Sequence, residues 1–349
     1  MIQFVEPAEF LQWAANAPVV DVRSPAEFQK GHIPNAQNVP LFDNDERHQV
    51  GLTYSENGKD EAVLKGLEFV GPKMKSLAET AIQLGQESTN KTVLLHCWRG
   101  GMRSQSVAWL FEQVGVQPVL LAGGYKAYRK YLRSLFERPI RMMVLSGLTG
   151  AGKTEILHEL QRTGEQVIDL EALANHRGSA FGGIGQPIQP TVEQFENLLG
   201  HDLLELDLSR RVWIEDESKK IGAAVIPDEF FEQKCAAPAI FIEIDQELRA
   251  QHILEHYGEL EPTELISATE RITKRFGGQN VLAVKNAISH GDLKTAVQLL
   301  LDYYDRSYLL AQSKQQRSYT DRLHFDSATD DVAAALIAAA DQILAQPAS

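Results

Sequence analysis

The chain has 349 residues, of which 34 are Lys or Arg, 47 are Asp or Glu and 44% are hydrophobic. This composition is typical of globular proteins and excludes collagen-like, coiled-coil and intrinsically disordered chains. At roughly 150 residues per domain, the length predicts two domains, each large enough to bury its own core. The net charge of −13 arises after residue 138: residues 1–138 carry 15 basic and 15 acidic side chains, and residues 139–349 carry 19 and 32. An acidic second half does not point to nucleic-acid binding, and does not exclude it, because a local basic patch would suffice.

Three features bear on the compartment. No apolar run approaches the roughly 20 residues that span a bilayer. The N-terminus, MIQFVEPAEF, lacks the basic segment and long apolar run of a signal peptide. The two cysteines, Cys97 and Cys235, cannot form a disulfide framework, which is typical of a reducing cytosol. We therefore expect a cytoplasmic protein without membrane contact.

The first part of the chain alternates apolar strands with helices. Strands are expected at 17–22, 36–40, 92–97 and 118–124, and helices at 25–31, 72–87, 104–114 and 125–136. The segment 43–71 is polar and punctuated by glycine, and it resists assignment. The alternation predicts an α/β fold with a parallel sheet.

The pair Arg138-Pro139 marks the expected boundary, which gives domains over 1–137 and 138–349. The alternation of strand and helix then restarts, with strands expected at 141–147, 166–170, 211–216 and 238–245 and a helix at 153–162. From about residue 247 the pattern is mostly helical, and an Ala-rich helix over 330–344 closes it. We expect a second α/β domain with a mostly helical C-terminal part.

The first chemical motif is Cys97-Trp-Arg-Gly-Gly-Met-Arg103-Ser104, a loop between a buried strand and a helix. The backbone N–H groups of such a loop, the helix N-terminus, Arg99 and Arg103 all favour an anion at the sulfur. The pattern predicts a nucleophilic thiolate, or a sulfur carried as an anionic persulfide. The alternative is a buried structural cysteine, which two glycines and two arginines within six residues disfavour. His96 points to the opposite face of the strand, which favours a packed core histidine.

Three segments resemble the rhodanese family: DVRSPAEFQKGHIPNAQNVP (21–40), the loop 97–103 and LAGGYKAY (121–128). The resemblance covers about residues 1–135 and implies a rhodanese-like parallel-sheet domain. It departs from a minimal rhodanese in the long stretch 43–90. The spacing of Cys, five residues and Arg also occurs in cysteine-dependent phosphatases, which leave the Asp-Val-Arg and Gly-His-Ile matches unexplained.

The rhodanese resemblance also implies roles for single residues. Cys97 would be the nucleophile that bears a persulfide or perselenide. Arg103 would orient the loop, and Asp21 would be a structural or site-supporting carboxylate. His32 would hold the Gly-His-Ile turn by a side-chain hydrogen bond.

The second motif, Gly147-Leu-Thr-Gly-Ala-Gly152-Lys153-Thr154, fits G-x-x-x-x-G-K-[ST] between an apolar strand and a helix, the context that a Walker A loop requires. Gly147, Gly150 and Gly152 let backbone N–H groups face a phosphate chain. Lys153 supplies a positive charge, and Thr154 can hold Mg²⁺. The motif predicts a P-loop NTPase-like domain. It does not prove nucleotide hydrolysis, because another diphosphate-bearing substrate would fit the same loop.

A carboxylate for the metal is expected on a later strand. The segment RVWIEDES offers Glu215, Asp216 and Glu217, and one residue of register decides which of them faces the phosphate. We prefer Asp216, so that Mg²⁺ would bind through Thr154 and Asp216. Asp169 is a further candidate carboxylate, or equally a helix N-cap. No tightly bound cofactor is expected.

The two loops in this order resemble the tRNA 2-selenouridine synthase family over nearly the whole chain, together with HRGSAFG (176–182), WIEDES (213–218) and YYDRSY (303–308). The resemblance implies replacement of sulfur by selenium in 2-thiouridine at the tRNA wobble position, with selenophosphate as donor and its supply enzyme as a partner. It also implies S-geranylation of the thiouridine by geranyl diphosphate, whose diphosphate the P-loop would hold without use of ATP. Alkylation would turn the sulfur into a leaving group, which a selenium nucleophile at Cys97 could displace from C2.

Six further side chains are candidates for substrate or tRNA contacts: His176, Arg177, Ser179, Arg210, Arg211 and Arg275. The glycine-rich segment 176–185 could close over the phosphate loop or be a solvated surface loop. Arg210 and Arg211 could meet tRNA phosphates or form an ordinary surface pair. Tyr304 and Tyr308 stand four apart on one helix face, and core packing explains them at least as well as base stacking. Cys235 is expected to be inert.

Two other functions stay open. An ATP-dependent kinase-like protein with an attached sulfurtransferase domain would show nucleotide turnover that depends on Lys153 and needs no tRNA. A non-catalytic sensor would use the rhodanese fold only to bind partners, but such modules generally lack the cysteine, so Cys97 counts against it.

Overall fold

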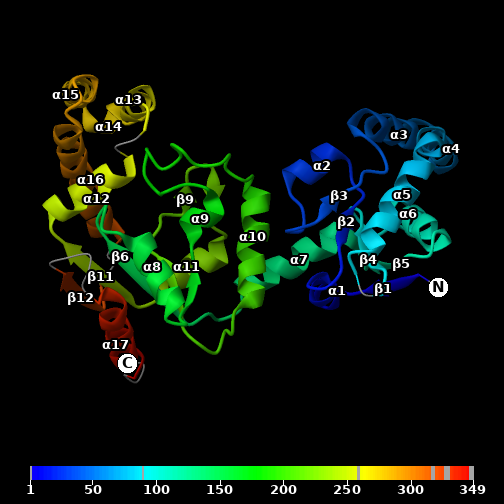
Figure 1. Ribbon diagram of the computed structural model, residues 1–349, viewed down its shortest axis with the longest axis horizontal. Helices are drawn as coiled ribbons and strands as arrows, with labels where there is room; N and C mark the ends of the chain where they lie inside the picture. The colour runs from blue at the N-terminus through cyan, green and yellow to red at the C-terminus, as the bar shows by residue number, and fades with distance from the viewer. Residues whose placement is uncertain (1, 89, 258–259, 316–318, 326–330, 346–349) are drawn as a thin grey trace. The chain divides into compact units, whose positions relative to one another are not determined.

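The computed structural model describes residues 2–88, 90–257, 260–315, 319–325 and 331–345. The chain divides into two compact units, 1–135 and 136–349, which Figure 1 shows from blue-cyan to red along the chain. The boundary expected from Arg138-Pro139 lies two residues further along. Each unit is an α/β domain built on its own parallel sheet.

The first unit is built on a five-stranded sheet in the order β1-β5-β4-β2-β3, in which every neighbouring pair is parallel. The strands are β1 (Gln3–Val5), β2 (Val19–Asp21), β3 (Gln37–Asn38), β4 (Thr92–His96) and β5 (Gln117–Leu121). The central strand β4 is apolar, and its Val93, Leu94 and Leu95 are fully buried. Asp21 at the end of β2 is in register with His96 at the end of β4, so the residues that follow both strands lie at one edge of the sheet.

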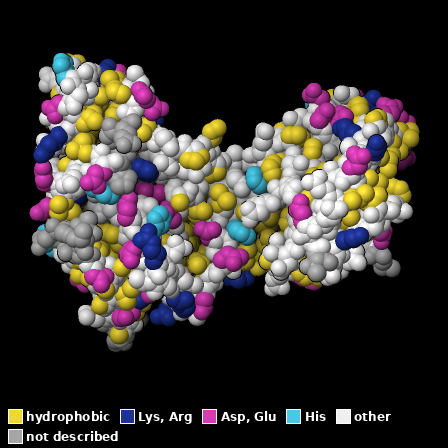
Figure 2. All heavy atoms as spheres, in the orientation of Figure 1, with side chains coloured by type: hydrophobic (Ala, Val, Ile, Leu, Met, Phe, Trp, Pro, Cys, Tyr) yellow, Lys and Arg dark blue, Asp and Glu magenta, His cyan; other side chains and the backbone are white. Residues whose placement is uncertain are grey.

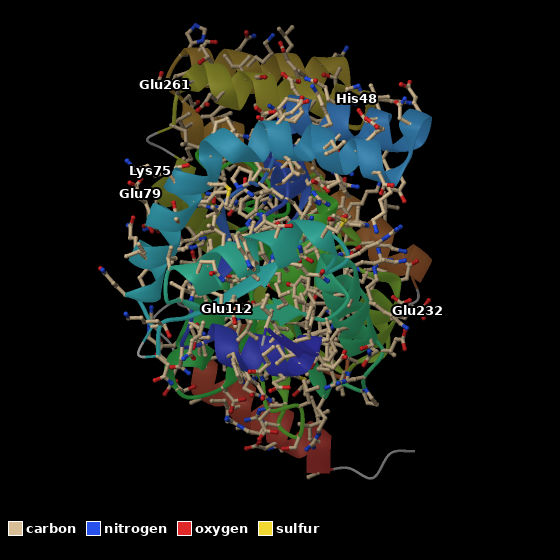
Figure 3. All side chains as sticks on the ribbon, turned by 90° about the vertical axis from the view of Figure 1, so that its right-hand side faces the viewer. His48, Lys75, Glu79, Glu112, Glu232 and Glu261 are labelled. Carbon is tan, nitrogen blue, oxygen red and sulfur yellow. The ribbon has the colours of Figure 1, made fainter. Side chains whose placement is uncertain are left out.

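Seven α-helices accompany this sheet in the described part of the first unit: α1 (Pro7–Ala14), α2 (Pro25–Lys30), α3 (Asn44–Asn57), α4 (Lys59–Val70), α5 (Met74–Gly85), α6 (Met102–Gln113) and α7 (Gly124–Phe136). The segment that resists assignment from sequence forms α3 and α4. Asp43 and Glu46 exchange hydrogen bonds in a capping box that begins α3. On α5, Lys75 and Glu79 stand one turn apart with their charged atoms 3.7 Å apart, and both point outward in Figure 3. The opposite face of α5 packs with α6 on the sheet.

The second unit has a five-stranded parallel sheet in the order β12-β11-β6-β8-β7. Its strands are β6 (Met142–Gly147), β7 (Gln166–Ile168), β8 (Val212–Glu215), β11 (Ala239–Ile244) and β12 (Asp321–Phe325). A short antiparallel pair, β9 (Lys220–Ile221) and β10 (Ala224–Val225), stands apart from the sheet. The helices between and after these strands are α8 (Lys153–Arg162), α9 (Leu170–Ala174), α10 (Val192–Glu205), α11 (Asp228–Ala236) and α17 (Val332–Ala345). Because β6 lies between β8 and β11, the loop that follows it emerges at the middle of the sheet.

The described residues between β11 and β12 form an excursion of five helices: α12 (Gln246–Tyr257), α13 (Pro262–Arg271), α14 (Thr273–Phe276), α15 (Gly278–Ser289) and α16 (Leu293–Gln315). Figure 1 shows α13, α14 and α15 grouped together, and their apolar faces form a core separate from that of the sheet. The mostly helical pattern predicted from residue 247 is confirmed apart from β12, a strand that the sequence analysis missed. Asp330, the expected first residue of the closing helix, lies outside the described residues. No helix in the described ranges combines the length and hydropathy needed to cross a membrane.

Candidate functional site

Cys97 follows β4 directly, and its side chain is buried within the loop that leads to α6. The hydroxyl oxygen of Ser104 lies 3.2 Å from the Cys97 Sγ and 3.2 Å from the carbonyl oxygen of Gly101. In the described part of the chain, the backbone N–H groups from Trp98 to Gly101 donate to no backbone carbonyl. The loop therefore keeps several donors that could serve an anion carried on the sulfur.

The turn after β5 holds this loop in place by backbone hydrogen bonds. The backbone N–H of Tyr125 donates to the Cys97 carbonyl at 2.8 Å, and that of Lys126 donates to the Trp98 carbonyl at 3.0 Å. Gly124 has a φ of +62°, and a Cβ on it would lie 2.4 Å from both the Cys97 carbonyl oxygen and the Gly100 nitrogen. Only glycine allows this approach, which explains why the closing segment carries Gly-Gly.

Asp21 supports the thiol loop through Arg23. The Arg23 guanidinium is 1% exposed and donates two hydrogen bonds to the Asp21 Oδ2, at 2.9 and 2.5 Å, and one to the Gly31 carbonyl at 2.7 Å. It also lies 3.8 Å above the Tyr125 ring, whose backbone holds the loop. Burial alone would raise the pKa of Asp21, but His96 and Arg23 hold it below its usual value. Asp21 is therefore a charged group that supports the loop through Arg23.

This buried pair allows a stability prediction. Arg23→Met would leave the Asp21 carboxylate buried without its partner, which typically costs about 3–5 kcal/mol. We expect a loss of that size in the free energy of unfolding measured with urea. Lys75→Met removes one member of the exposed pair Lys75–Glu79 and should change the free energy of unfolding by less than about 0.5 kcal/mol. Adding Asp21→Asn to Arg23→Met should recover part of the loss, and equal losses in the single and double variants would contradict a charge-pair origin.

Arg103 lies in the first turn of α6 and reaches across to α2. Its guanidinium donates to Glu27 at 2.7 and 3.3 Å, and Glu27 also accepts a hydrogen bond from the N–H of the N-cap residue Ser24. Burial works against ionisation of Glu27, but the hydrogen bonds and charge of Arg103 keep its pKa below the usual value. This contact ties the end of the thiol loop to α2. Arg99 is exposed beside the thiol.

The two histidines near the thiol loop have structural contacts. The Nδ1 of His32 lies 3.0 Å from the Phe28 carbonyl oxygen, and the ring stacks on that of Phe28. His96 is fully buried between Phe10 and Tyr125, as predicted for a core histidine. Burial lowers the pKa of His96 to about 4, so the ring is neutral at neutral pH.

The second motif forms a phosphate loop between β6 and α8. Gly150 and Gly152 have φ angles of +81° and +70°, which favour glycine. The Lys153 ammonium donates to the Gly147 carbonyl at 3.0 Å, so its side chain folds back over the loop. The Thr154 hydroxyl donates to the Glu171 carboxylate at 3.2 Å.

The phosphate loop opens into a cavity of about 620 Å³ with two chemically different ends. Its polar end contains the loop and the charged side chains Glu155, Asp169, Glu171, Arg177, Asp216, Glu217, Lys234 and His252. Its apolar wall comes mainly from the helical excursion and consists of Phe181, Ile253, Leu254, Leu265, Ile288, Leu293, Ala296, Val297, Leu300 and Leu301. One continuous pocket thus joins a phosphate cradle to a hydrocarbon-like surface.

Of the two neighbouring acids on the strand β8 segment, Asp216 is the one that lines the cavity. Its Oδ2 accepts a hydrogen bond from the Ser146 hydroxyl at 2.8 Å, and its Oδ1 accepts one from the Lys234 ammonium at 3.2 Å. Lys234 is 1% exposed. The hydroxyl of Tyr308 lies 2.6 Å from the Ser146 hydroxyl, and burial and the Asp216 charge both raise the Tyr308 pKa. Both oxygens of Asp216 are therefore engaged by the protein.

Glu215 points away from the cavity and is fully buried, where it accepts a hydrogen bond from the Leu170 N–H at 3.0 Å. Burial, followed by the charge of Asp169, raises its pKa well above the usual range. Asp169 accepts a hydrogen bond from the Ala172 N–H at 2.7 Å as the N-cap of α9, and it also lines the cavity. Asp169 can therefore be both a helix N-cap and a carboxylate of the site, the two roles considered for it from the sequence.

The carboxylate beside the Thr154 hydroxyl is Glu171, which sequence analysis missed. Burial and the charge of Glu217 raise the pKa of Glu171 to about 8. A Cβ on Gly178 would lie 2.7 Å from a carboxylate oxygen of each of these two glutamates, so the loop at Gly178 passes between them. Glu171 belongs to no short motif, and only its place on α9, after β7, brings it to the phosphate loop.

The six candidate contact residues separate into two groups. Arg177 and Ser179 line the cavity. The other four, His176, Arg210, Arg211 and Arg275, are not among the described residues that line it. His176 is half-buried, and burial and Arg271 lower its pKa. Arg211 forms ion pairs with Glu165 and Asp341. These two partners account for its position, and no contact with tRNA is needed to explain it.

Arg210 donates to the Gly164 carbonyl at 2.7 Å, and Arg275 is exposed on α14. In Figure 2 the Lys and Arg side chains are scattered among acidic ones on the visible face. Tyr304 and Tyr308 both line the cavity, and the Tyr304 hydroxyl accepts a hydrogen bond from the Ala180 N–H at 3.3 Å. Cys235 is exposed and borders the cavity.

Comparison with known proteins identifies a family for each of the two units. Residues 6–131 match the family model of the rhodanese-like domain, and residues 140–342 match that of the tRNA 2-selenouridine synthase AAA domain. A tRNA 2-selenouridine synthase of Sulfurovum sp. is 36% identical over 84% of this chain and 88% of its own length. One from Hydrogenovibrio crunogenus is 36% identical over 90% of this chain and 94% of its own length.

Among solved structures, a rhodanese-related protein from Thermoplasma volcanium is 20% identical over 37% of this chain and 92% of its own, with a TM-score of 0.23. The family models account for both units, and the two relatives span nearly the whole chain. This chain belongs to the tRNA 2-selenouridine synthase family.

Proposed function

We propose that this enzyme replaces the sulfur of wobble 2-thiouridine in tRNA by selenium, through an S-geranylated intermediate. Its relatives are named for tRNA 2-selenouridine synthesis, and both of the family's domains are present. Selenophosphate would be the selenium donor and geranyl diphosphate the prenyl donor. An enzyme that makes selenophosphate would be the supplying partner, and the reaction would take place in the cytoplasm with its tRNA substrate.

The cavity of the second unit carries this proposal. Geranyl diphosphate is an anion joined to a hydrocarbon chain, and the cavity joins a phosphate loop to an apolar wall. Its volume of about 620 Å³ lies within the range of roughly 300–1,000 Å³ that small-molecule sites have. The diphosphate would lie against Gly147–Thr154, and the prenyl chain would lie against α13, α15 and α16.

The ATP-dependent kinase alternative fits this wall less well. A nucleoside requires polar partners for its ribose hydroxyls and base edges, because unpaired polar groups are costly to bury. The wall beyond the phosphate loop instead presents the aliphatic side chains of residues such as Leu265, Leu293 and Leu300. Burial of a hydrocarbon chain there is favourable by roughly 25 cal/mol per Å².

In the first step, the thiocarbonyl sulfur would attack C1 of geranyl diphosphate. The S–C1 bond forms, the C1–O bond breaks, and diphosphate leaves with the bonding electron pair while N3 of the base loses its proton. Lys153 and the N–H groups of the phosphate loop stabilise the leaving anion. No nucleotide is consumed in this step.

In the second step, selenide released from selenophosphate by hydrolysis would attack a disulfide between Cys97 and an external thiol, so that a sulfur–selenium bond forms on Cys97 as the sulfur–sulfur bond breaks and the external thiolate leaves. The selenium on the Cys97 sulfur would then attack C2 of the geranylated base. The C2–Se bond forms and the C2–S bond breaks, so that geranyl thiol leaves. The external thiolate then attacks the Cys97 sulfur, which re-forms the disulfide and breaks the sulfur–selenium bond, and N3 regains a proton. The donors of the thiol loop would hold the anionic selenium before the attack.

A magnesium ion would fit beside the diphosphate. The described residues contain no group of three or more His, Cys, Asp or Glu side chains placed to hold a metal ion by themselves. Mg²⁺ often binds through one or two protein oxygens together with substrate phosphates. Thr154 was expected to serve with Asp216, but the carboxylate in contact with it is Glu171. When bound, Mg²⁺ would neutralise part of the diphosphate charge.

Filling the apolar wall should separate prenyl binding from diphosphate binding. Ala296 is 2% exposed and lines the cavity, so Ala296→Phe would occupy space that the prenyl chain needs. In calorimetric titrations we expect Ala296→Phe to bind geranyl diphosphate at least about tenfold more weakly than wild type does, and to bind inorganic diphosphate with unchanged affinity. Leu282→Phe changes an exposed residue of α15 and should leave both ligands unaffected. Equal weakening of the two ligands by Ala296→Phe would contradict a prenyl site at this wall.

The proposed reaction itself has a direct test. The purified protein would be incubated with tRNA that contains 2-thiouridine and with geranyl diphosphate, without ATP, and its nucleosides analysed by mass. We expect S-geranylated 2-thiouridine. If the product appears only when ATP is added, the kinase alternative is favoured.

A further inference from the structure

Helix α12 is pressed against the phosphate loop. Arg249 is 3% exposed, and its guanidinium donates to the Thr149 carbonyl at 3.0 Å and to Asp305 at 3.0 and 2.7 Å. A Cβ on Gly150 would lie 3.0 Å from the Arg249 carbonyl oxygen and 2.9 Å from the Cδ1 of Ile253. Helix α12 is therefore held in direct contact with the phosphate loop at Thr149 and Gly150.

His252 shares this face of α12, because residues three and four apart on a helix are neighbours. A Cβ on Gly152 would lie 3.9 Å from both the Cε1 and the Nε2 of the His252 ring. The Nε2 also lies 3.6 Å from the Glu155 Oε1. The side chain is 29% exposed and lines the cavity together with Lys153. The imidazole thus stands above Gly152, next to the expected place of a phosphate.

The charges around the cavity make a further cation important. Five acidic side chains line its polar end: Glu155, Asp169, Glu171, Asp216 and Glu217. Because the pKa of Glu171 is raised to about 8, the other four supply most of the negative charge at neutral pH. Among the described lining residues the permanently charged cations are Lys153, Arg177 and Lys234, and Lys234 is paired with Asp216. A diphosphate adds more negative charge, so each additional positive group has a large effect on its affinity.

The groups that face His252 favour its protonated form. Glu155 of α8 and the Gly150 carbonyl of the phosphate loop both act on its ring, and Glu255 acts from its own helix. Of these, the contact with Glu155 contributes most, and together they raise the pKa of His252 above its usual value. The ring therefore keeps its proton to a higher pH than an ordinary histidine does.

We propose that the imidazolium of His252 donates a hydrogen bond to an oxygen of the diphosphate above Gly152, as a second cationic binding residue beside Lys153. Glu155 holds the proton on the ring before the ligand arrives. This inference rests on the proposed function only in taking a diphosphate as the ligand. It makes diphosphate affinity depend on pH through a residue outside the phosphate-loop motif.

Calorimetric titration with inorganic diphosphate tests this role. Wild type, His252→Gln and His252→Arg, all full length and at a fixed excess of Mg²⁺, would be compared at about pH 6 and about pH 8.5, on either side of the range in which histidine titrates. We expect His252→Gln to bind about tenfold more weakly than wild type at the lower pH, because a charge-assisted hydrogen bond is lost. The difference should shrink at the higher pH, and His252→Arg should bind tightly at both. The ionisation of diphosphate affects the variants and wild type equally, so it cancels in the ratio of their dissociation constants at each pH.

His290→Gln, which changes an exposed histidine at the end of α15, serves as the matched control and should bind like wild type. Equal affinities of wild type and His252→Gln at about pH 6 would overturn the proposal. A loss that is the same at both pH values and is not rescued by arginine would indicate a structural role and would overturn it as well. Failure of the proposed function looks different: wild type would bind geranyl diphosphate no more tightly than inorganic diphosphate.

Discussion

Cys97→Ser should reduce 2-selenouridine in tRNA to background while S-geranylated 2-thiouridine accumulates. The substitution removes the sulfur that carries selenium but keeps a side chain of similar size within the loop between β4 and α6. The phosphate loop belongs to the other unit and is untouched, so the prenyl step should continue. Mass analysis of the tRNA nucleosides from a strain that carries the variant would measure both products.

The control for this prediction is Cys235→Ser, because Cys235 is the other cysteine of the chain and is exposed. Its selenouridine level should stay close to that of wild type. Undiminished 2-selenouridine in Cys97→Ser would refute the assignment of the nucleophile. A comparable loss in Cys235→Ser would mean that the second thiol takes part.

Lys153→Ala should block the earlier step. Its ammonium is expected to contact the diphosphate, and a charge-assisted contact contributes roughly 1.5–3 kcal/mol. Geranyl diphosphate should therefore bind about tenfold more weakly or worse, at about 1.4 kcal/mol per decade. Neither geranylated thiouridine nor selenouridine should form from 2-thiouridine tRNA.

Supplying tRNA that is already geranylated distinguishes the two mechanisms. Lys153→Ala should then make selenouridine at a rate near that of wild type, because Cys97 and its loop are intact. Cys97→Ser should leave the supplied intermediate unchanged. If Lys153→Ala stays blocked on geranylated tRNA, the phosphate loop provides energy for the selenium step, as the ATP-dependent alternative holds.

Sequence alone predicts the parts of this fold in which each residue acts close to its neighbours in the chain. The apolar strand before Cys97 and the Gly-Lys-Thr turn after β6 each carry their signal within about ten residues, and both loops form where they are expected. In contrast, α3 has almost no apolar periodicity, and α4 buries only the small residues Ala62 and Gly66, so the segment 43–71 resists assignment. β12 lies at a sheet edge and alternates exposed with half-buried residues, which gives it little apolar signal.

The candidate site shows the same limit more sharply. One residue of register separates Asp216, in the cavity, from Glu215, in the core, and only the pairing of β8 with β6 resolves it. Glu171 and His252 reach the phosphate loop from α9 and α12 and match no motif. Arg211 was a candidate for tRNA, but its partners Glu165 and Asp341 are 46 and 130 residues away in the chain, where no local pattern reveals them.

The parallel pairing of β11 with β12 has a consequence for how this enzyme could diversify. The chain leaves the sheet after Ile244 and re-enters it at Asp321, which is in register with Ile240, so the intervening helices form one module that crosses from the carboxyl ends of the strands back to their amino ends. The wall of the cavity belongs largely to that module, whereas the phosphate cradle belongs to the sheet. Changes confined to α13, α15 and α16 could therefore adapt the proposed prenyl site to longer or shorter hydrocarbon chains, whereas α12, which carries Arg249 and His252, would have to be kept for the phosphate loop.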